Sequence, residues 1–259
     1  MTQYTGHNLT PAHDLHHSWT GWPSSGSLPP LPAPPLLDAL ASAWHGDGLE
    51  LESHAWTAAD AHLTFRAGPD IAPVLVAQRA KGRLQHALRK AGTPVDFSRK
   101  VSVRSLGHNI TPTVERYVRE QLEHADLADP RCRATLAAAA VADASVDLAV
   151  PSETNSGRYW YNLHVVLVVA KRFRIGGADF LGRVREQALR AAAACECRVK
   201  ALAIMPDHLH AALRGDVARS PAEIAIALQN ATTHAAGCRM WQDGFYVGTF
   251  GEYDLGAVR

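Results

Sequence analysis

The order of predicted elements repeats once along the chain, and this repeat constrains the fold more than any other feature. Hydrophobic periodicity predicts strand, helix, strand, strand, helix, strand and a terminal helix in each half. In the first half these elements are expected at residues 13–20, 34–45, 49–57, 60–67, 70–91, 100–105 and 112–126. In the second half they are expected at 159–170, 178–194, 198–205, 207–214, 221–236 and 245–250, followed by a short stub. Strands and helices combined in this order predict an α+β fold.

Single residues follow the repeat at low identity. A gapless shift of 148 positions superposes three sets of residues: Leu15-His16 on Leu163-His164, His62 on His210, and Pro73 on Pro221. A shift of 144 positions superposes residues 101–107 on 245–251. We therefore predict a first module at 1–127, a linker at 128–157 and a second module at 158–259. The linker consists of an Ala-rich piece and a polar tail, and the sequence leaves open whether it contains a helix.

Composition sets the cellular context. The chain has 259 residues, 47% of them hydrophobic, which is enough for one large or two small domains. Apolar runs such as 165–170 are far too short to span a bilayer, and the N-terminus lacks the pattern of a secretion signal. The four cysteines form no paired framework, and Cys195-x-Cys197 lacks a second ligand pair at zinc-finger spacing. We expect a cytoplasmic protein with reduced thiols and no membrane partner.

Positive charge is concentrated in one segment. The formal net charge is only +1, yet residues 79–104 contain eight basic residues and one acidic residue, giving 8 − 1 = +7. Such a cluster can neutralise phosphates. A solvated helix face is the more common meaning of a charge run, so this feature alone leaves both interpretations open.

Two histidines stand on one predicted strand. His208 and His210 are two residues apart, so their side chains point to the same face while Leu209 points to the other. Two neighbouring imidazoles can hold one metal ion. The pair alone fits a structural role equally well, because the chain has 14 histidines.

The motifs around this pair resemble a known family. Residues 205–210 (Met-Pro-Asp-His-Leu-His), a helix that starts at Ser220-Pro221, and residues 241–251 (Trp-Gln-Asp-Gly-Phe-Tyr-Val-Gly-Thr-Phe-Gly) resemble the single-tyrosine HUH transposases of small insertion sequences and their REP-associated relatives. The resemblance covers about residues 158–259. It implies tandem ferredoxin-like modules with helices on one face of an antiparallel sheet. It also implies Mg²⁺ or Mn²⁺ on the two histidines, and a tyrosine that attacks single-stranded DNA to form a 5′-phosphotyrosine.

The tyrosine helix of this family should follow Gly251, but the matching pattern lies in the first half. There, Tyr117 and Gln121 are four residues apart, which places them on one face of a predicted helix. On the 144 shift Tyr117 corresponds to position 261, two residues beyond the last residue of the sequence. The resemblance implies that Tyr117 is the nucleophile and that Gln121 is a third metal ligand beside His208 and His210. We therefore predict a single composite site in a single-chain pseudo-dimer, which need not associate further.

The resemblance also suggests DNA contacts. Lys81-Gly82 falls where the family commonly has a Lys-Gly pair, and Trp241 is a candidate for stacking on unpaired bases. The candidate DNA-binding residues are Arg79, Lys81, Arg83, Arg99, Lys100 and Trp241. We expect single-stranded or hairpin DNA as the partner.

Three alternatives remain open on the sequence. Asp60 and His62 occupy the positions of the histidine pair in the first half, so they form either a vestigial or a second metal site. The chain is alternatively a non-catalytic protein that binds single-stranded or hairpin nucleic acid and derives from a transposase. A third interpretation is an unrelated metal phosphodiesterase, whose hydrolysis of nucleotides would not need Tyr117.

Overall fold

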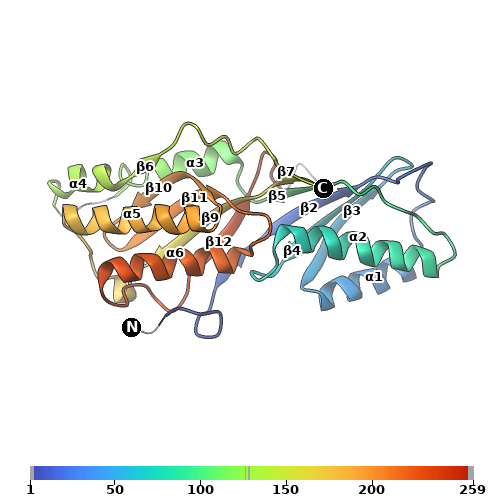
Figure 1. Ribbon diagram of the computed structural model, residues 1–259, viewed down its shortest axis with the longest axis horizontal. Helices are drawn as coiled ribbons and strands as arrows, with labels where there is room; N and C mark the ends of the chain where they lie inside the picture. The colour runs from blue at the N-terminus through green and yellow to red at the C-terminus, as the bar shows by residue number, and fades with distance from the viewer. Residues whose placement is uncertain (1–2, 126, 128, 256–259) are drawn as a thin grey trace.

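The computed structural model describes residues 3–125, 127 and 129–255 and contains two six-stranded sheets that lie side by side (Figure 1). The first sheet has the order β3-β4-β2-β5-β8-β7, and the second has the order β1-β12-β9-β11-β10-β6. No helix within the described ranges is both long and apolar enough to cross a membrane. The α+β class expected from the repeat is confirmed.

The first sheet is formed mainly by the first half of the chain. Its strands are β2 (His16–Gly21), β3 (Leu49–Trp56), β4 (Ala61–Ala67), β5 (Val101–Leu106), β7 (Ser152–Thr154) and β8 (Gly157–Trp160). Two helices, α1 (Pro34–Gly46) and α2 (Pro73–Lys90), cover one face of it. Both helices begin with a proline, which fits the first helical turn because that turn needs no amide donor.

The second sheet is formed mainly by the second half. Its strands are β1 (Ala12–Asp14), β6 (Val141–Ala142), β9 (Asn162–Val168), β10 (Arg198–Ile204), β11 (His208–Arg214) and β12 (Tyr246–Phe250). Helices α5 (Ala178–Ala194) and α6 (Pro221–Ala236) cover one face, and a 3-10 turn, η1 (Ala170–Arg172), follows β9. Helix α3 (Thr111–Arg119) contacts β10 and β11, while α4 (Cys132–Ala139) contacts α5 and β10. The predicted start of α6 at Ser220-Pro221 is confirmed, and Ser220 and Glu223 form a capping box there.

The two halves share one topology. In each, the second, third, first and fourth strands of the repeat are neighbours in that order: β3-β4-β2-β5 and β10-β11-β9-β12. This is the ferredoxin-like arrangement. Each half also has a β-bulge at the same place, between Leu51 and Ser53 in β3 and between Val199 and Ala201 in β10. Since 51 + 148 = 199, the bulges support the 148 shift for these strands.

The first strand of each half follows a different shift. His16 pairs with Arg66, and Asn162 pairs with Arg214, which is the 148-shift counterpart of Arg66. His16 therefore corresponds to Asn162, a shift of 146. The predicted superposition of Leu15-His16 on Leu163-His164 is wrong by two residues. Strand register depends on cross-strand pairing rather than on isolated matching histidines.

The halves cross at two glycines. The amide of Thr111 donates to the Gly251 carbonyl at 2.8 Å, and the amide of Leu255 donates to the Gly107 carbonyl at 3.1 Å. Both pairs obey the 144 shift, so the crossing has approximate two-fold symmetry. Beside it, β1 runs parallel to β12 and β8 runs parallel to β5, so each half adds a strand to the other's sheet.

Two connecting segments differ from the expectation. Residues 128–157, expected as a linker with or without a helix, contain helix α4 and the short strands β6 and β7. The helix expected at 112–126 ends at Arg119 and continues only as a turn. The stub predicted after Gly251 lies partly outside the described residues.

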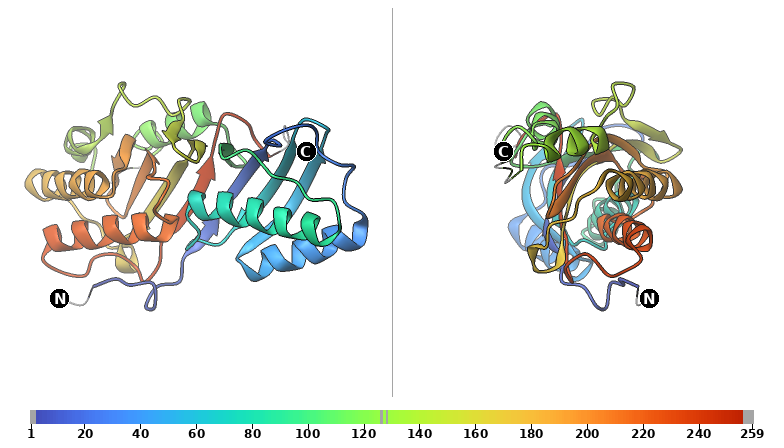
Figure 2. Two further views of the ribbon diagram at one scale, coloured as in Figure 1. Left: turned by 45° about the vertical axis from the view of Figure 1, so that its right-hand side comes forward. Right: turned by 90° about the vertical axis from the view of Figure 1, so that its left-hand side faces the viewer.

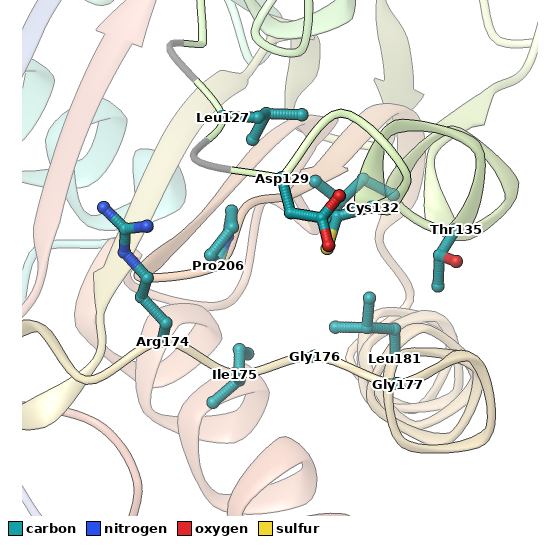
Figure 3. A pocket seen from close by; sticks show the side chains of 11 residues that line it. Leu127, Asp129, Cys132, Thr135, Arg174, Ile175, Gly176, Gly177, Leu181 and Pro206 are labelled. Carbon is teal, nitrogen blue, oxygen red and sulfur yellow. The ribbon is translucent and has the colours of Figure 1, made fainter.

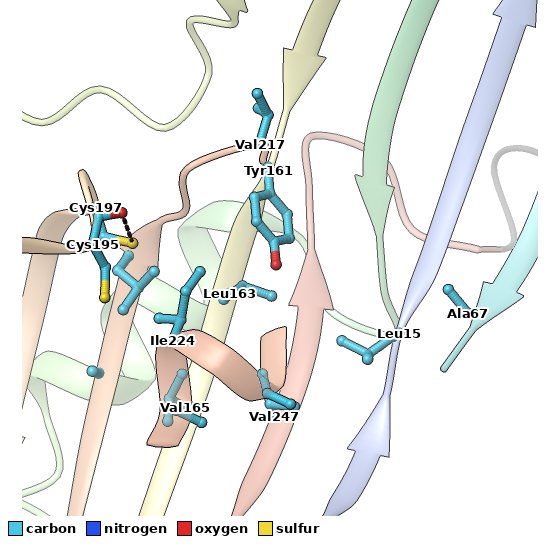
Figure 4. Packing of buried hydrophobic residues seen from close by; sticks show 14 of the residues in the cluster. Leu15, Ala67, Tyr161, Leu163, Val165, Cys195, Cys197, Val217, Ile224 and Val247 are labelled. Atoms are coloured by element: carbon cyan, nitrogen blue, oxygen red, sulfur yellow. Dashed lines mark hydrogen bonds between the residues drawn. The ribbon is translucent and has the colours of Figure 1, made fainter. Parts of the chain in front are cut away.

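One buried cluster joins both halves. It contains Leu15 and Ala67 from the first half together with Tyr161, Leu163 and Val247 from the second half (Figure 4). Each half therefore buries part of its apolar surface against the other half. Burial of about 25 cal/mol for each Å² of apolar surface makes this shared core a major source of stability.

His17 provides a test of acid stability in this core. Its ring is fully buried beside Tyr161, at 6.2 Å between ring centroids, and neither ring nitrogen has a partner among the described residues. Burial lowers the pKa of His17 from 6.5 to about 3. The unfolded chain therefore takes up a proton that the folded protein excludes, and stability falls as the pH drops below 6.5.

We expect His17→Leu to reduce this acid sensitivity. Between pH 7 and pH 5 the wild-type free energy of unfolding should fall by about 2 kcal/mol more than that of the variant. Urea unfolding at both pH values measures the difference, and other histidines cancel because both proteins contain them. Equal losses in the two proteins would contradict the prediction.

Candidate metal and tyrosine site

Helix α3 belongs to the first half but packs on the sheet of the second. Val114 and Val118 on α3 join a buried cluster with residues of the second sheet and of the segment that follows β6: Val146, Leu148, Ala201, Ala203, Ala212 and Phe250. Leu209, Ala211 and Leu213 of β11 belong instead to the core that includes α5 and α6. Because strand residues alternate, α3 and the two helices cover opposite faces of the sheet (Figure 2).

Tyr117 faces the histidines of the other half. Its ring centroid lies 5.5 Å from that of His210 and 5.9 Å from that of His164, and both contacts are edge-on. The side chain is also 48% exposed. The structure thus brings Tyr117 beside His210 on a surface that an external molecule can reach.

His208 stands next to His210 with its tautomer fixed. The two ring centroids are 4.8 Å apart. The Nδ1 atom of His208 lies 2.6 Å from a carboxylate oxygen of Asp207, whose other oxygen accepts a hydrogen bond from Arg172 at 2.9 Å. An Nδ1–H group directed at a carboxylate leaves the Nε2 lone pair free for a metal ion.

His164 holds His210 from the neighbouring strand. Its Nε2 lies 2.9 Å from His210 Nδ1, and the rings are stacked at 5.2 Å. Burial lowers the pKa of His164 to about 4 and that of His210 to about 3, so both rings are neutral at pH 7. In the tautomer in which His210 Nδ1–H donates to His164 Nε2, the Nε2 lone pair of His210 is available for a metal ion. Two neutral imidazoles on one face fit a divalent ion.

Three of these residues lay outside the predicted site. Asp207 and His164 contact the histidine pair directly, and Arg172 contacts Asp207. Asp207 directly precedes His208 in the chain, so the sequence itself indicated a carboxylate that could contact the His208 ring. His164 could be placed only with the correct register of β9.

Gln121 does not share a helical face with Tyr117, because α3 ends at Arg119. The side-chain nitrogen of Gln121, Nε2, instead donates to the backbone carbonyl of Tyr117 at 3.1 Å. For Gln121 to bind a metal ion beside His208, its side chain would have to leave this contact.

Three of the candidate DNA-binding residues make contacts within the first half. Arg83 forms a two-point ion pair with Asp47 at 2.7 and 2.8 Å, and Arg79 donates to the Asp47 carbonyl at 2.6 Å. Lys81 donates to the Ser98 carbonyl at 2.8 Å. These contacts join α2 to its neighbours on the helix-covered face of the first sheet. Arg99 and Lys100 are exposed just before β5.

Trp241 does not present its ring for stacking. It is 1% exposed, and its indole nitrogen donates to the Thr232 hydroxyl at 2.7 Å. The prediction that Trp241 contacts DNA is therefore wrong in this structure, because the ring belongs to the core beneath α6.

Asp60 and His62 make local contacts. Asp60 accepts a hydrogen bond from the Thr57 hydroxyl at 2.7 Å, and His62 Nδ1 lies 2.9 Å from the Thr20 hydroxyl. Burial lowers the pKa of His62. These two side chains belong to no group of three possible ligands in the part of the chain that the structure describes.

A cavity of about 290 Å³ opens between α4 and the start of α5 (Figure 3). Its lining is mainly apolar but includes Asp129, Cys132 and Arg174. Pro206, the neighbour of Asp207, closes one side of it. No residue of the predicted site lines this cavity.

Comparison with known families agrees with the resemblance of the second half. The family model described as "Transposase IS200 like" matches residues 158–259. No curated protein matches the chain.

Solved structures give weaker similarities. A REP-associated tyrosine transposase bound to a REP hairpin is 14% identical, with a TM-score of 0.31 over 35% of this chain and 56% of that one. The regulatory subunits of aspartate kinase from Thermus thermophilus and Thermus flavus are 12% and 14% identical, and both give TM-scores of 0.21. They cover 86% and 88% of this chain and 92% and 99% of their own. TM-scores this low do not identify a shared fold.

Proposed function

We propose that this protein is a metal-dependent single-stranded DNA endonuclease and strand transferase with one active site built from both halves. The observation that carries the proposal is the position of Tyr117, on a helix of the first half, beside His210 on the sheet of the second. The family match of residues 158–259 supports the transposase class for the histidine-bearing half. The tyrosine comes from residues outside that match.

His208 and His210 would hold the divalent ion through their Nε2 atoms. Mg²⁺ or Mn²⁺, when bound, supplies Lewis-acid polarisation of the scissile phosphate. Asp207 keeps the His208 ring in place and in the tautomer that metal binding needs, and His164 holds the His210 ring in place. Arg172 neutralises Asp207 and fixes its direction.

Tyr117 would be the nucleophile. Its hydroxyl oxygen forms a bond to phosphorus while the bond from phosphorus to the 3′ oxygen of the preceding nucleotide breaks. The products are a 5′-phosphotyrosine and a free 3′-hydroxyl, which receives the tyrosine proton through solvent. Rejoining reverses these steps and needs no nucleotide cofactor.

A labelled DNA hairpin with a single-stranded flank tests the proposal. Wild-type protein with Mn²⁺ should give a protein–DNA band that survives a denaturing gel. When EDTA is added before the DNA, the band should not form, because the two imidazoles then hold no ion. Peptide mapping of the band should place the DNA on Tyr117.

His210→Ala should reduce the yield of this band at least about 100-fold, because one of two protein ligands is lost. His54→Ala, at an exposed histidine of the first sheet, is the matched control and should leave the yield unchanged. Hairpin binding without any covalent band would instead favour a non-catalytic binding protein, and nucleotide hydrolysis that persists without Tyr117 would favour a phosphodiesterase.

A further inference from the structure

A second group of metal-binding side chains lies at the crossing of the two halves. Within residues 3–125, 127 and 129–255, three possible ligand atoms come within 4.8 Å of one another only at Asp14, His16 and His108. His16 Nε2 lies 2.8 Å from Asp14 Oδ1, and His108 Nε2 lies 3.5 Å from Asp14 Oδ2. Asp14 is in the strand added to the second sheet, His16 begins β2, and His108 follows β5.

We propose that Asp14, His16 and His108 form a second, structural site for a divalent transition-metal ion. Two imidazole nitrogens and one carboxylate oxygen suit Zn²⁺ better than Mg²⁺, which prefers oxygen ligands. Three protein ligands leave a fourth position for water. This site is separate from His208 and His210 and does not depend on the function proposed above.

The surroundings of His16 are those of a metal ligand. Its Nδ1 lies 2.7 Å from Glu52 Oε2, and its ring is 1% exposed. A carboxylate on one ring nitrogen directs the other nitrogen, Nε2, at the remaining two ligands. The backbone of His16 is also fixed, because its amide donates to the Thr249 hydroxyl at 2.7 Å.

A protonated His16 between Asp14 and Glu52 would account for only part of this arrangement. It would explain the two carboxylates, but not the approach of a third donor. His108 Nε2 faces the same carboxylate of Asp14, although its side chain is 70% exposed and free to turn toward solvent. A shared cation accounts for all three donors.

The fold alone does not require these residues. In the related half, shifts of 146 and 144 place Trp160, Asn162 and Glu252 at the positions of Asp14, His16 and His108. That set contains a single carboxylate and no imidazole. Arg104 lies over the Trp160 ring at 3.6 Å and pairs with Glu252 at 3.3 Å. The ligand set is therefore a specific property of one side of the crossing.

An ion in this site would fasten the connection to the tyrosine helix. His108 lies between Gly107, where the halves cross, and α3, which carries Tyr117. The ion would tie this segment to β1 and β2. It would stabilise the crossing whether or not the protein cleaves DNA.

Metal binding by untagged protein that carries His208→Ala and His210→Ala tests the proposal. After dialysis against Zn²⁺ and then metal-free buffer, elemental analysis should give one ion per chain. Co²⁺ should give the visible absorption of a four- or five-coordinate site. Adding Asp14→Asn and His108→Ala should abolish both signals, while adding His13→Ala, at an exposed neighbour, should not.

Substitution of Glu52, which contacts His16 Nδ1, should weaken the binding of Zn²⁺ only in part. Glu52→Gln should weaken Zn²⁺ binding by about 10- to 100-fold without removing it. Zn²⁺ should raise the thermal midpoint of the background protein but not that of the Asp14→Asn, His108→Ala protein. Absence of a bound ion in the background protein, or unchanged binding after both substitutions, would overturn the proposal; because His108 is exposed, its loss does not threaten folding.

Discussion

Replacing Tyr117 with Phe is expected to abolish covalent attachment of DNA while leaving the binding of a hairpin within about two-fold of wild type. Phenylalanine keeps the edge-on ring contacts with His164 and His210 and removes only the oxygen atom. Loss of a nucleophile typically costs a factor of about 10³ or more in rate. The yield of the denaturation-resistant band and a binding titration measure the two quantities.

Tyr253→Phe is the matched control, because Tyr253 is also about half exposed but lies after the crossing at Gly251. It should give a wild-type yield of the covalent product. A persistent band in Tyr117→Phe would mean that the nucleophile lies elsewhere. A band lost in Tyr253→Phe alone would move that role to Tyr253.

Substitution of either crossing glycine by alanine is expected to destabilise the protein strongly. A Cβ atom at Gly107 would lie 2.2 Å from the Thr249 carbonyl oxygen, and one at Gly251 would lie 2.1 Å from the Ser105 carbonyl oxygen. Both neighbours are backbone atoms, so the two halves would have to separate at the crossing. We expect a loss of about 2–4 kcal/mol for each substitution, measured by urea unfolding.

Gly82→Ala is the matched control for these substitutions. Gly82 lies in the interior of α2, and a Cβ atom there would have no neighbour within 4 Å. Alanine at an exposed helical position should stabilise the protein by about 0.5–1 kcal/mol. Wild-type stability of Gly107→Ala and Gly251→Ala would show that the crossing adjusts freely.

The Gly107→Ala variant also distinguishes a loss of folding stability from a displacement of α3, which carries Tyr117. Displacement of the segment after Gly107 should move α3 away from β10 and β11. Gly107→Ala should therefore lose covalent activity at temperatures where it remains folded. Gly82→Ala should retain it.

Secondary structure was readable where local signals are strong. The helices predicted at 178–194 and 221–236 coincide with α5 and α6. Each has apolar residues at helical spacing, and α6 also has the capping box of Ser220 and Glu223. The strand that holds His208 and His210 was predicted at 207–214 and is observed at His208–Arg214, because its apolar run is short and bounded by turn residues.

Errors occurred where long-range contacts override local signals. The polar segment 128–157 gives too little periodicity to predict β6 or β7, which exist because each completes the edge of a sheet. Trp241 follows a loop-like sequence, and its buried position brings its indole N–H to the Thr232 hydroxyl and its backbone amide to the distant Tyr4 hydroxyl. The register of β2 depends on pairing with β4 and β5, which isolated matching residues do not reveal.

The amino-acid sequence was sufficient to identify the repeat, the α+β class, the strand that carries His208 and His210, and the helix that carries Tyr117. These features depend on local periodicity and residue type. Only the tertiary structure brought Tyr117 of one half to within a ring contact of His210 in the other. It did so because the two halves of the chain cross at Gly107 and Gly251, where the lack of side chains allows the two backbone segments to contact each other. The same crossing brought the distant His108 to Asp14 and His16, which are only two residues apart in the chain.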